Sequence, residues 1–293
     1  MQHIQPAPSN VILKCTPMKL LDISWDQVMT MEILGCDLPD CLDVLRSVPG
    51  MTQLKFNCIN IDDFLSGAQP ATHGSLRSLK ITETSLTDLL PLLILPDLQE
   101  LFVDYTSLFI DYTSLASEVT DFVKQSGCQL TRLTIEFSYE KNTEDTERYI
   151  ITLLEYIPTL QDLRLADVHL TDVFFQRLKP ANSTATSGST SLEAPTGTFL
   201  PALHTLFIDC AKNFSWLSVC DIFIPASRYS SPSVKVFRLV ISSDTSWGSG
   251  KVSIDRSAAD FLISARKRFN AQITVVCEGI DMLSAIEAEE DAK

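Results

Sequence analysis

The sequence contains few glycines and few histidines, and both shortages limit the chemistry that the chain can carry. Only 10 of its 293 residues are glycine and 4 are histidine. A glycine-rich nucleotide loop is therefore not expected. No histidine has a cysteine or a carboxylate at metal-ligand spacing, so no metal site is predicted either. Basic residues are also in the minority, with 23 against 37 acids and a net charge of -14. This balance argues against nucleic acid or an anionic membrane as the main partner.

Segments that direct a chain to membranes or to export are not apparent. No apolar run reaches the roughly 18 residues that a membrane span requires, and Met1–Asn10 has no apolar signal-peptide core. The 8 cysteines include no CxxC pair. Without an export signal, such cysteines are typical of reduced thiols. We therefore expect a cytoplasmic or nuclear protein.

Catalytic motifs are missing as well. Gly248–Lys251 has the composition of part of a phosphate-binding loop, but Thr245 stands where the motif needs its first glycine. The residue after the lysine is Val252 instead of Ser or Thr. There is no G-x-S-x-G elbow. The sequence predicts a protein that is not an enzyme and has no cofactor, and a nucleotide-dependent enzyme built on Lys251 is the weakest alternative.

What the chain does have is a repeat of the form apolar-x-x-apolar-x-apolar. Its eight copies start at Val28, Met51, Leu76, Leu98, Leu130, Leu160, Leu203 and Val234. The first intervals fall in the range of about 20–29 residues that is typical of leucine-rich repeats. In five copies a proline stands two residues before the start, and these are Pro49, Pro96, Pro158, Pro201 and Pro232. Proline has no amide hydrogen and suits the entry to a strand. Each copy is therefore predicted to be a strand.

The segments between the copies predict helices. In Thr143–Ile157, acids occupy the first turns and apolar residues follow at helical spacing. The other expected helices are Asp40–Ser47, Ser117–Gln125, Asp172–Lys179 and Ser257–Phe269. Strands that alternate with helices run parallel. The predicted fold class is thus α/β, a leucine-rich-repeat solenoid with a curved parallel sheet on the concave side and helices on the convex side.

The composition also predicts the limits of this solenoid. It is expected to cover residues 11–280, with Val11–Cys15 as a first strand and a Ser/Thr-rich inserted loop at 179–199. Residues 1–10 are predicted to be disordered and residues 281–293 to be an acidic tail. The ninth position of a repeat favours a small hydrogen-bonding residue. That position is occupied by Cys36, Thr84, Thr106 and Ser138.

Side chains between the apolar positions are expected to point into the concavity, because strand side chains alternate. Four of the eight mid-strand residues are cationic and only Glu32 is anionic. With their neighbours they form a candidate protein-binding surface of Lys55, Lys80, Phe102, Arg132, Arg164, His204, Phe207 and Arg238. Lys55 and Lys80 are expected to be close neighbours, since adjacent strands lie about 4.8 Å apart.

Two interpretations of this surface remain open. In one, it recognises an acidic or phosphorylated segment of a target protein. In the other, it is a structural ladder in which Glu32 pairs with Lys55 and Arg164 stacks on Phe207.

Three segments resemble the leucine-rich-repeat region of the F-box-like families of mushroom-forming fungi. They are Ile23–Met51, Leu153–Leu165 and Leu200–Leu206. The resemblance implies the substrate-recognition half of an F-box-type ubiquitin-ligase receptor, which holds a target protein on the concave face. Nothing before Val28 resembles an F-box, so a Skp-type adaptor is expected only if an F-box is supplied elsewhere. The alternative is a free-standing leucine-rich-repeat scaffold, or a truncated family copy, without ligase coupling.

Overall fold

The computed structural model describes residues 9–15, 24–61, 68–105, 112–137, 144–179, 199–225, 232–241 and 253–291. The chain divides into two compact units, Met1–Lys141 (unit 1) and Asn142–Lys293 (unit 2). Both units consist of mostly parallel strands joined by helices, so the predicted α/β class is confirmed.

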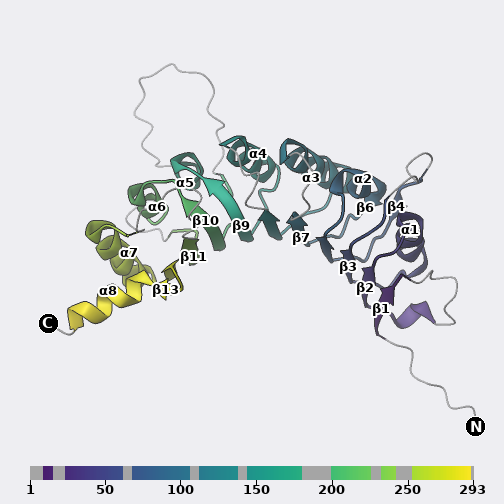
Figure 1. Ribbon diagram of the computed structural model, residues 1–293, viewed down its shortest axis with the longest axis horizontal. Coiled ribbons are helices and arrows are strands. Elements are labelled where there is room, and N and C mark those ends of the chain that lie inside the picture. The colour runs from purple at the N-terminus through teal and green to yellow at the C-terminus, as the bar shows by residue number, and fades with distance from the viewer. Residues whose placement is uncertain are drawn as a thin grey trace, which may run out of the picture. The chain divides into compact units, whose positions relative to one another are not determined.

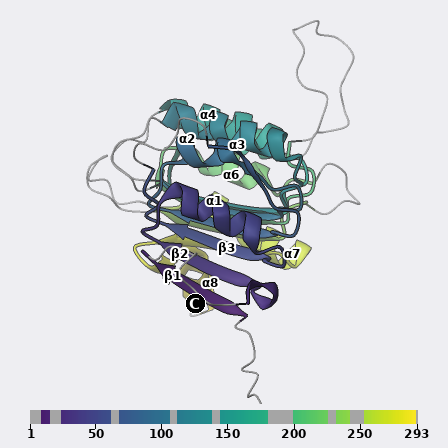
Figure 2. The ribbon, with the colours of Figure 1, turned by 90° about the vertical axis from the view of Figure 1, so that its right-hand side faces the viewer.

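The main sheet of unit 1 is parallel throughout its described strands. In spatial order these are β1 (Asn10–Lys14), β2 (Thr30–Leu34), β3 (Gln53–Asn57), β5 (Ser78–Thr82), β7 (Glu100–Tyr105) and β8 (Arg132–Phe137). Two short strands, β4 (Ala71–Thr72) and β6 (Leu93–Ile94), pair separately. The helices are η2 (Trp25–Gln27), α1 (Leu38–Ser47), α2 (Leu86–Leu89), η3 (Leu90–Leu92) and α3 (Tyr112–Ser126). Helices α1, α2 and α3 lie on one side of the sheet (Figures 1 and 2).

Unit 2 repeats this arrangement with longer strands. Its parallel strands are β9 (Asp162–Leu170), β10 (Thr205–Lys212), β11 (Val236–Ile241) and β12 (Gln272–Cys277), and β13 (Ile280–Asp281) is antiparallel to β12. The helices are α4 (Glu144–Glu155), α5 (Asp172–Leu178), α6 (Trp216–Asp221), α7 (Arg256–Phe269) and α8 (Met282–Asp291). In Figure 1, α5 and α6 lie beside each other on one side of the sheet.

The repeat produces these strands because its apolar positions stack in register from one strand to the next. In unit 1, Leu54 pairs with Leu79 and Leu79 with Leu101, and each is at most 3% exposed. In unit 2, Leu206 pairs with both Leu163 and Phe237. Burying an aliphatic side chain stabilises the fold by about 1.5–3 kcal/mol. The stacked positions therefore supply the core of each unit.

The recurring phase of the prolines has a second cause besides the missing amide hydrogen. Pro49, Pro96, Pro158 and Pro201 lie in turns that precede the strands. Each turn is closed by a backbone hydrogen bond over three residues, as from Met51 N to Val48 O (3.2 Å). Proline presets the backbone at the second position of such a turn. The prolines therefore stand in the turn that leads into each strand and not in the strand itself.

The ninth position of the repeat links neighbouring repeats, as predicted. The Thr84 hydroxyl donates to Thr82 O (2.9 Å) and accepts from Ile59 N (3.1 Å). The Cys36 carbonyl accepts from Asn60 N (3.0 Å). These bonds satisfy backbone groups that would otherwise be buried without partners. Thr106 and Ser138 lie outside the described residues.

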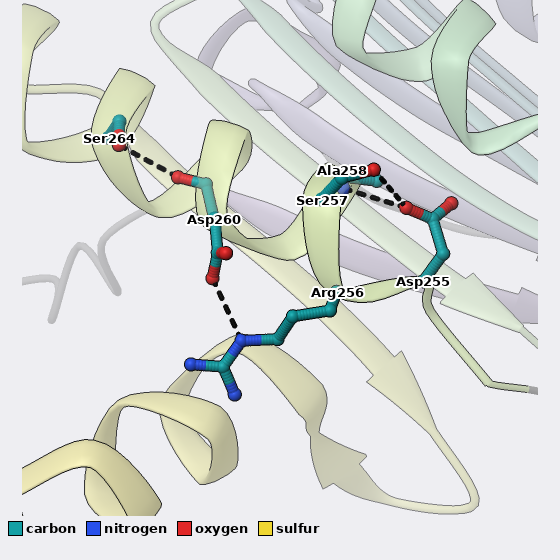
Figure 3. Close-up of polar contacts among 6 residues, drawn as sticks. All are labelled: Asp255, Arg256, Ser257, Ala258, Asp260 and Ser264. Carbon is teal, nitrogen blue, oxygen red and sulfur yellow. Dashed lines mark hydrogen bonds and ion pairs between the residues drawn. The ribbon is translucent and has the colours of Figure 1, made fainter.

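Helix α7 begins with a capping interaction of the kind that its sequence favours. Asp255 accepts hydrogen bonds from Ala258 N (2.8 Å) and from the Ser257 hydroxyl (2.7 Å), as Figure 3 shows. One turn further on, Arg256 Nε lies 3.0 Å from Asp260 Oδ1. An aspartate at this position satisfies a free amide and complements the helix dipole.

Three features differ from the sequence analysis. Strand β12 follows Asn270, which stands where the repeat requires an apolar residue, and the pattern therefore missed it. The segment predicted to be an acidic tail forms β13 and α8 instead, and Glu287 of α8 pairs with Arg266 and Lys267 of α7. The predicted loop 179–199 lies outside the described residues except at its ends, as does all of residues 1–8.

Candidate functional site

Each unit presents one sheet face whose side chains are not part of its core, and we call it the open face. On β3 it carries Gln53, Lys55 and Asn57, while Leu54 and Phe56 are buried. On β10 it carries Thr205, Phe207 and Asp209, which alternate with buried residues in the same way. Seven of the eight predicted site residues lie on the open faces of β3, β5, β7, β8, β9, β10 and β11, with exposed or half-buried side chains. These are Lys55, Lys80, Phe102, Arg132, Arg164, Phe207 and Arg238.

The middle row of the open face in unit 1 runs through Glu32, Lys55, Lys80 and Phe102. The register pairs each of these residues with the next, so the predicted proximity of Lys55 and Lys80 is confirmed. Lys55 Nζ lies 2.5 Å from Glu32 Oε1. Lys80 Nζ lies 3.7 Å from the centre of the Phe102 ring, a cation–π contact. Each lysine of this row therefore has a partner within the same sheet.

Arg132 lies one row away, and it too has a partner. Its guanidinium is 2.6 Å from Glu100 Oε1, on the adjacent strand β7. The side chains remain 59% and 39% exposed. Exposed pairs of this kind contribute at most about 1 kcal/mol. Their larger effect here is to reduce the positive charge that the face offers to a partner.

The middle row of the open face in unit 2 has a different pattern. The register places Phe207 of β10 between Arg164 of β9 and Arg238 of β11. The Arg164 guanidinium lies 5.0 Å from the centre of the Phe207 ring, so the predicted stacking is confirmed. Among the residues that the structure describes, neither arginine forms an ion pair. This row thus holds two cations and one aromatic ring.

His204 is not brought into this row. It precedes β10, and its backbone carbonyl accepts from Lys235 N (2.8 Å) and Val236 N (3.0 Å). Its Nδ1 atom lies 2.5 Å from Ala202 O in the preceding turn. His204 therefore belongs to the turn that starts the repeat. The spacing of the repeat predicted that His204 lies on the open face. The prediction is wrong because His204 stands one residue before β10, where the alternation of strand side chains does not yet apply.

Sequence reasoning considered two open positions on each strand and missed the third. That third position carries acids on both units, including Asp104 and Glu136 in unit 1 and Asp209 in unit 2. Extending the period of two by one more step would have found them. With these residues included, the open faces are mixed in charge, and only the middle rows are enriched in cations.

Two buried titratable groups elsewhere, Glu147 and His73, have structural partners. The Glu147 carboxylate accepts from Thr171 N (2.8 Å), from the Thr171 hydroxyl (2.7 Å) and from Phe174 N (3.0 Å), at the start of α5. His73 Nε2 donates to Val48 O (2.8 Å). Both side chains thus satisfy backbone groups of a neighbouring repeat.

Several thiols have environments that suppress ionisation. Burial raises the pKa of Cys128 to about 11 and that of Cys220 to about 12. A hydrogen bond to Glu83 raises the pKa of Cys58, the side chain of which is exposed. A nucleophilic cysteine requires the opposite shift. No cluster of ligands able to hold a metal ion occurs in the described ranges, and Gly248–Lys251 lies outside them.

A comparison with known protein families and with curated proteins finds no match to this chain. None of the helices in the described segments is both long and apolar enough to cross a membrane. The assignment of a function therefore depends on the open faces themselves.

Proposed function

We propose that this protein is a non-enzymatic protein-interaction module that binds a target protein through the open faces of its leucine-rich repeats. The observation that carries the proposal is the pairing of two opposite faces on the same strands. One face is apolar, stacked and buried. The other presents charged and aromatic side chains in register. Arginine and aromatic residues are favoured at the centres of protein interfaces.

The leucine-rich-repeat assignment is supported by three features of the described repeats. The apolar positions stack in register, a turn with proline at its second position precedes several strands, and Thr84 connects neighbouring repeats through its hydroxyl. A repeat here consists of one strand and the segment that connects it to the next strand. The first two features recur from repeat to repeat, and the third links one repeat to its neighbour. Together these features are typical of a repeat architecture in which each repeat buries its apolar side against its neighbours.

Site-specific photo-crosslinking in cells tests which face binds. A benzophenone side chain is placed at Gln53 or Gln272, which are exposed on the open faces of units 1 and 2. Matched control positions are Lys124 on α3 and Ser264 on α7, which are exposed on helices. We expect one partner protein to be crosslinked from the open-face positions and not from the helix positions. Equal crosslinking from both sets, or crosslinking from the helices alone, would contradict the proposal.

The link to a ubiquitin ligase that the resemblance to F-box-like proteins implies is tested in the same crosslinked samples by mass spectrometry. If an F-box is supplied elsewhere, a Skp-type adaptor and a cullin should accompany the crosslinked partner. A partner recovered without them favours the alternative, a free-standing leucine-rich-repeat scaffold.

A further inference from the structure

We propose that Arg164, Phe207 and Arg238 of unit 2 form a subsite for an acidic peptide segment of the partner, held across strands β9, β10 and β11. The inference rests on the proposed function, because it names one part of the open face and the chemistry that it recognises. The occupant is a segment with two carboxylate side chains, one for each arginine.

The first support is the arrangement of the three side chains. They occupy directly paired positions on neighbouring parallel strands. Strands are about 4.8 Å apart, so the backbones of the two arginines are separated by about 9.6 Å with Phe207 between them. Arg164 stacks on the ring. Stacking restricts the guanidinium while its N–H groups stay available, and this lowers the conformational entropy lost when a carboxylate binds.

The second support is charge complementarity. Arg164 and Arg238 are exposed and form no ion pair within the described ranges. The cations of unit 1 differ, since Lys55 and Arg132 are each paired with a glutamate. A carboxylate that approached Lys55 or Arg132 would have to displace an existing glutamate, whereas Lys80 lies over the Phe102 ring. In unit 2 a carboxylate would gain a new partner, so an acidic segment is favoured there.

The third support fixes the direction of the segment. The rows on either side of the subsite contain acids, Asp162 on β9 and Asp209 on β10. An acidic chain that ran along the strands would meet these carboxylates, whereas one that crosses the strands meets only the middle row. In a segment with polyproline II conformation, residues three apart lie on the same side of the chain and are about 9.3 Å apart. The expected motif is therefore acidic-x-x-acidic.

The same spacing favours two carboxylates over one phosphate. A single phosphate would require both guanidinium groups to converge on one point. Here each arginine comes from a different strand and an aromatic ring lies between them. The arrangement suits one carboxylate at each end of a short apolar contact with Phe207.

The test uses the full chain and a fluorescein-labelled decapeptide with two glutamates three residues apart in a Gly/Ser/Pro background. Binding is measured by fluorescence anisotropy. We expect measurable binding that is lost when both glutamates are replaced by glutamine. Arg164→Gln and Arg238→Gln should each weaken binding up to about fivefold, and the double variant about tenfold. Lys124→Gln on α3 and Arg256→Gln on α7 are the matched controls, because both cations are exposed on helices and lie outside the open faces, and each should change binding less than twofold.

Several results would overturn the subsite. These are equal binding of the glutamate and glutamine peptides, equal losses in the control variants, and binding only when phosphoserine replaces the glutamates. Photo-crosslinking from Gln272 separates this failure from that of the proposed function. Crosslinking that persists unchanged in the Arg164→Gln/Arg238→Gln double variant overturns the subsite alone. Absence of crosslinking from both Gln53 and Gln272 in the otherwise unchanged chain contradicts the proposed function itself.

Discussion

The open faces of the two units are built on the same repeat but use their cations differently. In unit 1, Lys55 is paired with Glu32 and Arg132 with Glu100. In unit 2, Arg164 rests on an aromatic ring and Arg238 has no ion pair among the described residues. What separates them is the residue on the neighbouring strand, not the repeat. A cation beside a carboxylate contributes to its own sheet, whereas a cation beside an aromatic ring remains available to a partner. Unit 1 has one cation of the second kind in its middle row, Lys80 over Phe102, and unit 2 has two arginines around Phe207.

The units also differ in the buried polar group that joins their repeats, and this difference leads to the largest expected effect. Glu147 in unit 2 accepts three hydrogen bonds at the start of α5, while His73 in unit 1 donates to Val48 O and accepts from Ser75 N. Glu147→Ala should lower the free energy of unfolding by about 3 kcal/mol, because it leaves buried donors without acceptors. His73→Leu should lower it by about 2 kcal/mol.

Urea denaturation followed by circular dichroism measures both variants of this pair. Loss of less than about 1 kcal/mol in Glu147→Ala would contradict the role assigned to the carboxylate. A larger loss in His73→Leu than in Glu147→Ala would reverse the comparison between the units.

Removal of the cap of α7 should have the next largest effect, and the effect should depend on pH. The hydrogen bond from Ala258 N is the main cause that lowers the pKa of Asp255 below 3.8. The Asp255 carboxylate therefore stabilises the folded state above pH 3.8. This stabilisation is lost as the pH falls through the lower pKa that Asp255 has in the folded state. Asp255→Ala should cost about 1 kcal/mol at pH 7, and the cost should shrink below about pH 4. Asp255→Asn is the control, since it keeps an acceptor without the charge. If the loss of unfolding free energy in Asp255→Ala stayed constant down to pH 2, the Asp255 carboxylate would not be the cap of α7.

The ion pairs of the open faces should have a smaller effect on stability than the cap of α7. Lys55→Gln should lower the free energy of unfolding by about 0.5 kcal/mol because it breaks an ion pair, and high salt should reduce this effect. Arg238→Gln should leave stability unchanged, since it removes no ion pair. Thermal unfolding of the two variants at low and high salt measures both stability changes. Equal losses in both would show that the arginine also has a structural partner.

The smallest expected effect concerns thiol reactivity, in which the units also differ. Unit 1 exposes Cys15 and Cys58, whereas Cys210, Cys220 and Cys277 of unit 2 are buried. The Glu83 carboxylate raises the pKa of Cys58. Glu83→Gln should therefore speed the alkylation of Cys58 by iodoacetamide about threefold at pH 8, because more thiolate is present. Peptide mass spectrometry measures the rate, with Cys15 as the internal control. An unchanged rate at Cys58 would contradict the proposed effect of Glu83.

Much of the fold was predictable because it depends on local periodicity. The strands at Met31, Leu54 and Leu79 follow from the spacing of apolar residues, since each side chain is buried by the equivalent residue of the next repeat. Strand β12 was missed because Asn270 breaks the pattern. Helix α8 was missed because its acids suggested a solvated tail, and the charges of Arg266 and Lys267 that pair with Glu287 belong to another helix.

The candidate site was predictable as a set of positions but not as a set of interactions. The alternation of strand side chains was enough to place Lys55, Lys80 and Arg238 on the open face. Whether each cation has a partner depends on the residue opposite it, and hence on the register between strands. His204 was misplaced because one residue of offset moves a side chain from the strand to the turn.

The sequence by itself determined the α/β class, the repeat and the residues that line the core, because burial of apolar side chains follows directly from their spacing. The tertiary structure decided which charges are neutralised within the sheet and which are left for a partner. It also decided that Glu147 and His73 have structural roles, since both bond to backbone groups far away in sequence. Such contacts depend on which strands and helices become neighbours, and local periodicity does not encode the distances between their side chains.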